Sequence, residues 1–227
     1  MSRVGRYLRD NGLTLAFLGL LLGAVIGQAF AGVAELNGEQ RATGGATLSV
    51  AQYLRSSEFA VDVAENWQSE YLQFALYIVA TTWLVQRGSS ESKSLGKIGG
   101  GTDREQKIGR YAEPDSPAWA RAGGWRTALY GRSLGAIMTF FFAMALLAQS
   151  IAGRAAFNGQ LLNRDQDALS WSGYLTSADF WNRTFQNWQS EFLAVASMSA
   201  FAIYLRQRGS PESKLVGAAH DATAEDP

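Results

Sequence analysis

Two long uncharged stretches alternate with two shorter ones along the chain. Residues 11–34 and 133–153 contain no Asp, Glu, Lys or Arg, and each is about 20 residues or longer, enough to cross roughly 30 Å of hydrocarbon as a helix. The shorter stretches are residues 71–86 and 192–205. Since about 14 residues cover only about 21 Å, a helix of a soluble core is an alternative interpretation of these two runs.

An internal repeat favours the membrane interpretation for the short runs as well. Residues 53–96 align with residues 174–217 at a constant offset of 121 residues, and 20 of the 44 aligned positions are identical. Each short run follows a long one at a matching distance, and a lone hairpin arm in the bilayer would have no return. We expect an all-α integral membrane protein with four transmembrane helices, arranged as two tandem helical hairpins related by an internal parallel repeat.

The same pattern predicts the boundaries of this arrangement. The four helices are expected close to residues 13–33, 66–87, 133–153 and 187–207. Glycine, proline and mixed charge are typical of a flexible linker in the middle of the chain. The predicted organisation is a first two-helix repeat at 1–96, a flexible cytoplasmic linker at 97–124, a second two-helix repeat at 125–217 and a disordered tail at 218–227.

Lysine and arginine counts predict the orientation, because cytoplasmic connections carry the excess of these residues. The middle connection has nine of them and the N-terminal segment has three, whereas the two outer connections have two and three. We therefore expect a multi-pass protein of the cell inner membrane with both termini in the cytoplasm. Two spans per repeat give both halves the same orientation, which predicts a pseudo-two-fold axis along the membrane normal.

Local sequence marks the ends of the helices on the outer side. Asn37-Gly38 and its counterpart Asn158-Gly159 predict turns after the first span of each repeat. Ser56-Ser57 and Thr176-Ser177 fit helix N-caps. The periodicity of apolar residues from Asp179 onward predicts a helix that runs from the outer surface into the membrane.

Glycines mark the ends of the helices on the inner side. Gly88 and Gly209 lie where a helix is expected to stop. Ser210-Pro211-Glu212 has the order of an N-cap, a first-turn proline and a first-turn acid, which predicts a short second helix along the inner surface.

The first span also has features of a secretory signal. Arg3, Arg6 and Arg9 precede an apolar stretch that ends in Ala29-Phe30-Ala31, which fits an A-x-A cleavage site. The uncharged stretch is longer than the usual apolar region of about 7 to 15 residues, and its repeat counterpart, 133–153, is internal. We expect the span to be retained, and cleavage is the alternative.

Composition limits the chemistry. The chain has no cysteine and one histidine, His220, so haem, zinc or iron–sulfur chemistry has almost no ligands. Gly99-Gly100-Gly101 lacks the Lys-Ser/Thr of a phosphate-binding loop. The basic central loop also carries five acids, and positive-inside charge explains it without nucleic acid. We expect no enzyme activity, no cofactor, no metal and no nucleic-acid partner.

One set of polar residues in the predicted spans needs an explanation. Asn66 and Glu70 are four residues apart and share a helix face. A carboxylate at the centre of a span costs on the order of 2.5 to 3.5 kcal/mol. The full candidate cluster consists of Gln28, Asn66, Glu70, Gln149, Asn187 and Glu191.

Two hypotheses account for this cluster. The side chains either form hydrogen bonds that pack the helices, or they form a cation or proton site near the pseudo-two-fold axis. A conduction path would continue inward, as Gln73 and Tyr77 do in the first repeat. The counterparts in the second repeat are Ala194 and Met198, so packing is the favoured hypothesis.

Gly19, Gly23 and Gly27 recur every four residues on the first span. Such spacing allows two helix backbones to approach closely. It predicts packing within the protein and, as a further possibility for a partner besides the lipid bilayer, a homodimer.

The repeated motifs suggest a family. Asn-Trp-x-Ser-Glu and Gln-Arg-Gly-Ser-x-Glu-Ser-Lys, together with Tyr-Leu-x-Ser and Asp10-Asn11-Gly12, resemble a family of small bacterial integral membrane proteins defined only by a domain of unknown function. The resemblance implies no substrate, activity or cofactor. The expected function is a structural or interaction role in the bacterial inner membrane, and the alternative is a channel or transporter for protons or small cations that uses Glu70 and Glu191.

Overall fold

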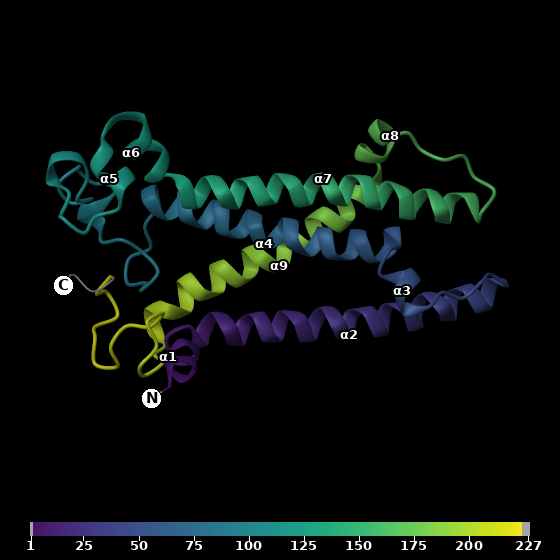
Figure 1. The fold of residues 1–227 in the computed structure, drawn as a ribbon, viewed down its shortest axis with the longest axis horizontal. Coiled ribbons are helices and arrows are strands. Elements are labelled where there is room, and N and C mark those ends of the chain that lie inside the picture. The colour runs from purple at the N-terminus through teal and green to yellow at the C-terminus, as the bar shows by residue number, and fades with distance from the viewer. Residues whose placement is uncertain (1, 224–227) are drawn as a thin grey trace. The chain divides into compact units, whose positions relative to one another are not determined.

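Every regular element in the part of the chain that the structure describes, residues 2–223 of the computed structural model, is helical (Figure 1). The all-α class is therefore confirmed. The four long helices are α2 (Gly12–Thr43), α4 (Ser57–Trp83), α7 (Ser133–Leu162) and α9 (Ala178–Tyr204). The short elements are α1 (Arg3–Asp10), α3 (Val50–Tyr53), η1 (Leu95–Lys97), η2 (Gly109–Tyr111), α5 (Ala118–Ala122), α6 (Gly124–Tyr130) and α8 (Trp171–Leu175).

The chain divides into two compact units. One consists of residues 2–63 with 152–168, and the other of residues 64–151 with 169–223. This division differs from the boundaries of the sequence repeat, because α4 and α7 each contribute to both units. The segment predicted as a flexible linker, 97–124, contains η2 and α5. In the segment predicted as a disordered tail, residues up to 223 have described positions, and residues 224–227 lie outside the described residues.

The long helices differ from the predicted spans mainly in where they begin and end. α2 continues to Thr43 and α7 to Leu162, so the turns predicted at Asn37-Gly38 and Asn158-Gly159 are wrong. The side chain of Asn37 explains the first case. Its Nδ2 donates to the Leu48 carbonyl at 2.8 Å, and its Oδ1 accepts from the Leu48 amide at 2.6 Å. Asn37 thus fixes the loop after the helix while remaining helical itself.

Of the helices in residues 2–223, α2 over Gly12–Ala42 and α7 are long and apolar enough to cross a membrane. α4 and α9 have 27 residues each, which corresponds to about 40 Å. They are longer than the predicted spans because they begin well before the predicted first residues, 66 and 187. Their extra turns are charged and polar, and they do not meet the same standard of apolarity.

Serine residues start both of these helices, as predicted. The Ser177 hydroxyl accepts a hydrogen bond from the Phe180 amide at 3.2 Å, and the Ser56 hydroxyl accepts one from the Phe59 amide at 3.3 Å. Because an N-cap pairs an amide that the helix cannot satisfy, these serines fix the starts of two equivalent helices.

The repeated tyrosine of Tyr-Leu-x-Ser anchors the connection between the two long helices of each repeat. Tyr53 and Tyr174 are buried and pack edge-to-face on Phe59 and Phe180, with ring centroids 5.6 and 5.7 Å apart. A Cβ on Gly32 would overlap the Tyr53 hydroxyl, so glycine is required where this ring meets α2. Each repeat therefore builds the same local corner.

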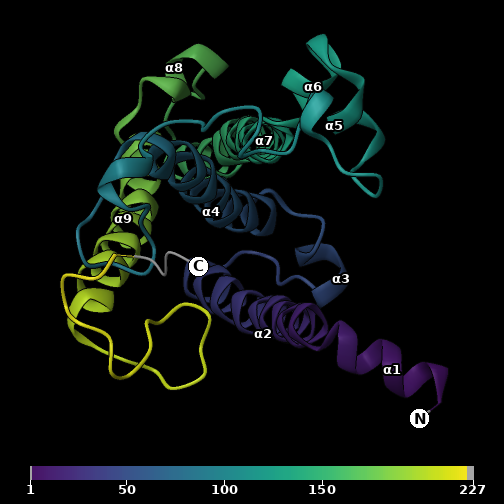
Figure 2. The same cartoon turned by 90° about the vertical axis from the view of Figure 1, so that its left-hand side faces the viewer.

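In the second unit α4 contacts α7 through side chains that remain partly exposed. Tyr71 stacks on Phe141 with centroids 5.1 Å apart, and a Cβ on Gly135 would be 3.7 Å from the Val79 side chain. In the same unit α5 and α6 pack against each other ahead of α7 (Figure 2).

Candidate functional site

Six polar side chains join α4 to α9 within the second unit, and we call them the polar seam: Glu65, Gln68 and Ser69 on α4, and Arg183, Trp188 and Glu191 on α9. The residues on α4 follow the i, i+3, i+4 spacing that places side chains on one helix face. Arg183 Nη1 lies 3.1 Å from Glu65 Oε2, and Trp188 Nε1 donates to Gln68 Oε1 at 2.8 Å. Ser69 Oγ lies 3.5 Å from Glu191 Oε1.

The centre of the polar seam is closed to solvent. Gln68 and Ser69 are 0% and 1% exposed. Gln68 Nε2 donates to the Glu65 carbonyl at 3.1 Å, and Ser69 Oγ donates to the Asn66 carbonyl at 2.9 Å. A buried amide without hydrogen-bond partners costs about 1–3 kcal/mol. The hydrogen bonds of Gln68 offset this cost.

The structure divides the predicted cluster between different surroundings. Gln28 lies on α2 in the first unit, and the other five residues lie in the second. Asn66 and Glu70 are exposed, whereas Glu191 is half-buried. Asn187 donates to the carbonyl of Arg183, one turn back on its own helix, at 2.9 Å.

Gln149 has its own partner on α9. It is fully buried, and its Nε2 donates to Thr184 Oγ1 at 3.1 Å. Its Oε1 has no hydrogen-bond partner within the described residues. The neighbouring Ser150 Oγ accepts from Trp171 Nε1 at 3.1 Å. Polar packing therefore extends from α7 to both α8 and α9.

The polar seam uses residues of α4 other than those in the predicted cluster. On α4 the predicted cluster contains Asn66 and Glu70, whereas the buried face carries Gln68 and Ser69. Each step of one residue turns the side chain by about 100° around the helix, so these polar neighbours do not share one face. The available sign was the spacing of Glu65, Gln68 and Ser69 at i, i+3 and i+4 along the helix.

A second repeated motif, Gln-Arg-Gly-Ser-x-Glu-Ser-Lys, forms the same turn twice; we call the copies, residues 86–93 and 207–214, the inner turns. Their glycines, Gly88 and Gly209, have φ of 84° and 82°, a conformation that favours glycine. The following serine hydroxyls complete each turn. The bonds are Gln86 N to Ser92 Oγ at 2.8 Å, Gln207 N to Ser213 Oγ at 2.9 Å, and Glu91 N to Ser89 Oγ and Glu212 N to Ser210 Oγ at 3.2 Å each.

The lysine that ends each inner turn binds backbone carbonyls. Lys93 Nζ donates to the Gly99 carbonyl at 2.7 Å. Lys214, only 5% exposed, donates to the carbonyls of Ala219, His220 and Ala222 at 3.1, 3.0 and 2.9 Å. The helix predicted to begin at Ser210 is therefore wrong, because the serine and lysine bonds hold these residues in a turn.

The two inner turns also meet each other through an acid pair. Tyr77 Oη donates to Glu91 Oε2 at 2.8 Å, and Ser90 Oγ donates to the Glu212 carbonyl at 2.8 Å. The Glu91 and Glu212 carboxyl groups lie near each other. Burial is the main reason that the pKa of Glu91 is raised; the Tyr77 hydrogen bond opposes the shift, and Glu212 adds to it.

Residues 2–223 contain no group of three or more His, Asp and Glu side chains placed to hold a metal ion. Together these features define the class: a helical protein with a duplicated motif set, two apolar helices of membrane-spanning length, and polar side chains paired between helices.

The chain belongs to the family described as Domain of unknown function (DUF6766), whose sequence profile matches residues 4–225. The resemblance drawn from the motifs is confirmed by this match. No curated protein and no solved structure matches the chain.

Proposed function

We propose that the protein is a multi-pass integral protein of the bacterial inner membrane, with four spans and both termini in the cytoplasm. Its role in this proposal is structural or interactive, without enzyme activity. The apolarity and length of α2 and α7 support it. α4 and α9 are the return arms, and their 27 residues each reach about 40 Å, more than the roughly 30 Å of a hydrocarbon core.

The observation that carries the structural role is the pairing of polar side chains between α4 and α9. Trp188 donates to Gln68 at 2.8 Å, and Arg183 pairs with Glu65 at 3.1 Å. Hydrogen bonds between helices fix how they pack in a bilayer. Groups that already bind each other are not available to a solute, which favours packing over transport.

Topology is tested first, using the absence of cysteine from the chain. The wild type should stay in the membrane after alkaline carbonate extraction. Single cysteines at Gly44 and Asn163 should react with an impermeant thiol reagent in intact cells, and one at Gly100 should react only after the cells are opened. Reaction at Gly100 with none at Gly44 would reverse the proposed orientation, and extraction by carbonate would reject an integral protein.

The alternative is a path for protons or small cations through Glu70 and Glu191. Two observations favour it: Glu191 is half-buried, and its contact with Ser69 is long, at 3.5 Å. Proteoliposomes with an imposed pH or potassium gradient separate the two functions. Packing predicts no flux above protein-free vesicles and near-normal stability for Glu70→Gln and Glu191→Gln. Flux that these substitutions abolish while the fold persists would establish transport.

The proposal extends to a homodimer through Gly19, Gly23 and Gly27. A Cβ added at any of these glycines would meet no other atom within 4 Å, and small residues at this spacing allow a second helix to approach closely. The oligomeric state of the protein in detergent, compared with that of Gly23→Leu, tests this contact.

A further inference from the structure

A short amphipathic helix precedes the apolar helix of the first repeat. α1 covers Arg3–Asp10 and leads through Asn11 into α2. On a helical projection its three arginines, Arg3, Arg6 and Arg9, fall on one side. The apolar residues Val4, Tyr7 and Leu8 fall on the other side and are 67%, 61% and 53% exposed.

Side-chain hydrogen bonds cap both ends of this helix. The Ser2 hydroxyl accepts from the Gly5 amide at 3.2 Å, and Asn11 Nδ2 donates to the Tyr7 carbonyl at 2.9 Å. The only acid of α1, Asp10, pairs with Arg9 at 2.9 Å on the surface, where such pairs contribute little. The arginine side therefore keeps most of its positive charge.

A second element with exposed apolar residues and arginines precedes the apolar helix of the second repeat. α5 and α6 carry the exposed residues Trp119, Trp125 and Leu129, and Trp125 is 67% exposed. The two tryptophans pack edge-to-face at 6.0 Å. Thr127 holds the pair of helices together, because its hydroxyl donates to the Trp119 carbonyl at 2.7 Å.

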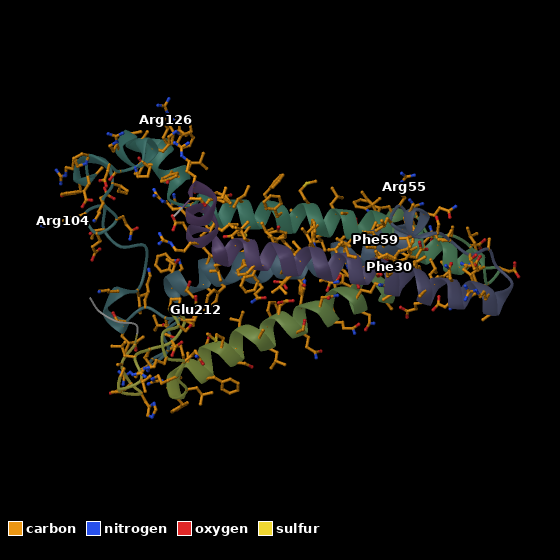
Figure 3. All side chains as sticks on the ribbon, turned by 60° about the horizontal axis from the view of Figure 1, so that its bottom comes forward. Phe30, Arg55, Phe59, Arg104, Arg126 and Glu212 are labelled. Atoms are coloured by element: carbon orange, nitrogen blue, oxygen red, sulfur yellow. The ribbon has the colours of Figure 1, made fainter. Side chains whose placement is uncertain are left out.

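Arginine surrounds this aromatic surface as well. Residues 117–132 contain Arg121, Arg126 and Arg132 and no acid. The Arg126 guanidinium lies 5.6 Å from the Trp125 ring centroid, and its side chain projects away from the ribbon (Figure 3). Exposed tryptophan beside arginine is typical of a protein surface at the membrane interface.

The repeat relates the two elements. The offset of 121 residues carries α1, residues 3–10, onto residues 124–131, which α6 covers up to Tyr130. It pairs Val4 with Trp125 and Leu8 with Leu129. In both repeats an exposed apolar face with arginines therefore lies directly before an apolar helix of spanning length.

We propose that α1 and the α5–α6 pair are two interfacial collars that bind the anionic headgroups of phospholipids. This inference rests on the proposed function, because α2 and α7 must enter the bilayer for the collars to lie at its surface. The apolar residues insert below the headgroups, and the arginines contact the phosphates. Arginine suits this partner, since its planar guanidinium binds phosphate oxygens in pairs. A nucleic acid would use the arginines but would leave Val4, Leu8 and Trp125 in water.

The test uses full-length protein with a single cysteine at Leu8 or Leu129, labelled with a dye whose emission shifts to the blue on entering a membrane. The labelled protein is reconstituted into phosphatidylcholine vesicles with or without phosphatidylglycerol. Phosphatidylglycerol should produce a blue shift that high salt reverses. One cation near an anionic surface contributes about 1 kcal/mol, so each arginine removed should lower the ratio of docked to undocked collar about fivefold.

Matched variants isolate the arginines. Arg3→Gln/Arg6→Gln/Arg9→Gln should abolish the shift at residue 8, and Arg121→Gln/Arg126→Gln/Arg132→Gln should abolish it at residue 129. Changing the same arginines to Lys should keep most of the shift. The control, Arg41→Gln/Arg55→Gln/Arg164→Gln, removes equal charge outside the collars and should change nothing.

The outcomes separate this inference from the proposed function. Emission that does not depend on phosphatidylglycerol or on the arginines, in protein that resists alkaline extraction, would reject the collars and leave the membrane protein. A loss of the shift in the Lys variants as large as in the Gln variants would reject the role of charge. Wild-type protein that alkaline carbonate extracts would reject both proposals together.

Discussion

The two copies of Asn-Trp-Gln-Ser-Glu have the same sequence and different surroundings. On α4, Gln68 and Ser69 are buried, and Trp67 is exposed. On α9, Gln189 and Ser190 are exposed, and Trp188 donates to Gln68 of the other copy. The copies therefore contribute opposite sides of one contact. A repeated helix motif does not have to occupy repeated environments.

The inner turns behave in the opposite way. In both copies serine hydroxyls accept the same hydrogen bonds from backbone amides, and both glycines have the same φ within 2°. The reason is the range of the interactions. Bonds between residues a few positions apart are fixed by the motif itself, whereas the contact of Gln68 with Trp188 depends on how two distant helices meet.

The largest effect is expected where the two inner turns differ most, at their lysines. Lys214→Met removes three carbonyl bonds, and Lys93→Met removes one. Because a hydrogen bond to a charged group contributes about 1.5–3 kcal/mol, Lys214→Met should lower the free energy of unfolding by at least that amount and Lys93→Met by clearly less. Denaturant titration in detergent measures both. Equal losses would mean that the inner turns are equivalent in energy as well as in geometry.

The next effect concerns the two copies on the helices. Gln68→Leu leaves the Trp188 indole N–H without its acceptor and should cost about 1–2 kcal/mol. The matched change in the other copy, Gln189→Leu, affects an exposed side chain and should stay within about 0.5 kcal/mol. The same titration compares them, and tryptophan fluorescence reports the environment of Trp188. Similar losses for both would contradict the asymmetric contact.

The smallest effect is a pH dependence at the acid pair of the inner turns. The pKa of Glu91 is raised above 4.5, mainly by burial, so the folded protein holds this proton more tightly than the unfolded chain does. Its contribution to stability is fully present below about pH 4.5 and is lost as the pH rises through the raised pKa. Glu91→Gln should remove this part of the pH dependence in thermal melts, and Asp103→Asn, at an exposed acid, should not. A Glu91→Gln profile that matches the wild type would show that the carboxyl pair is not responsible.

The sequence was sufficient for the order of the four long helices and for Ser177 as a helix start, because periodicity and capping act over a few residues. The sequence was not sufficient to identify which face of α4 is buried. Gln68, Ser69 and Glu70 are adjacent polar residues, so no apolar spacing indicates which of them faces inward. The end of α2 was missed for a related reason. Asn37 bonds to Leu48, 11 residues away, beyond the range of any turn preference.

The carbonyl binding of Lys214 has a consequence for the charge of the protein. Its three acceptors are neutral backbone groups. The ammonium group therefore stabilises the turn while no bound carboxylate neutralises its positive charge. The same holds for Lys93 and the Gly99 carbonyl. In the proposed topology both cations flank the inner ends of spans, where positive charge opposes translocation. One residue in each motif copy thus shapes the turn and helps to keep that end of the hairpin on the cytoplasmic side during insertion.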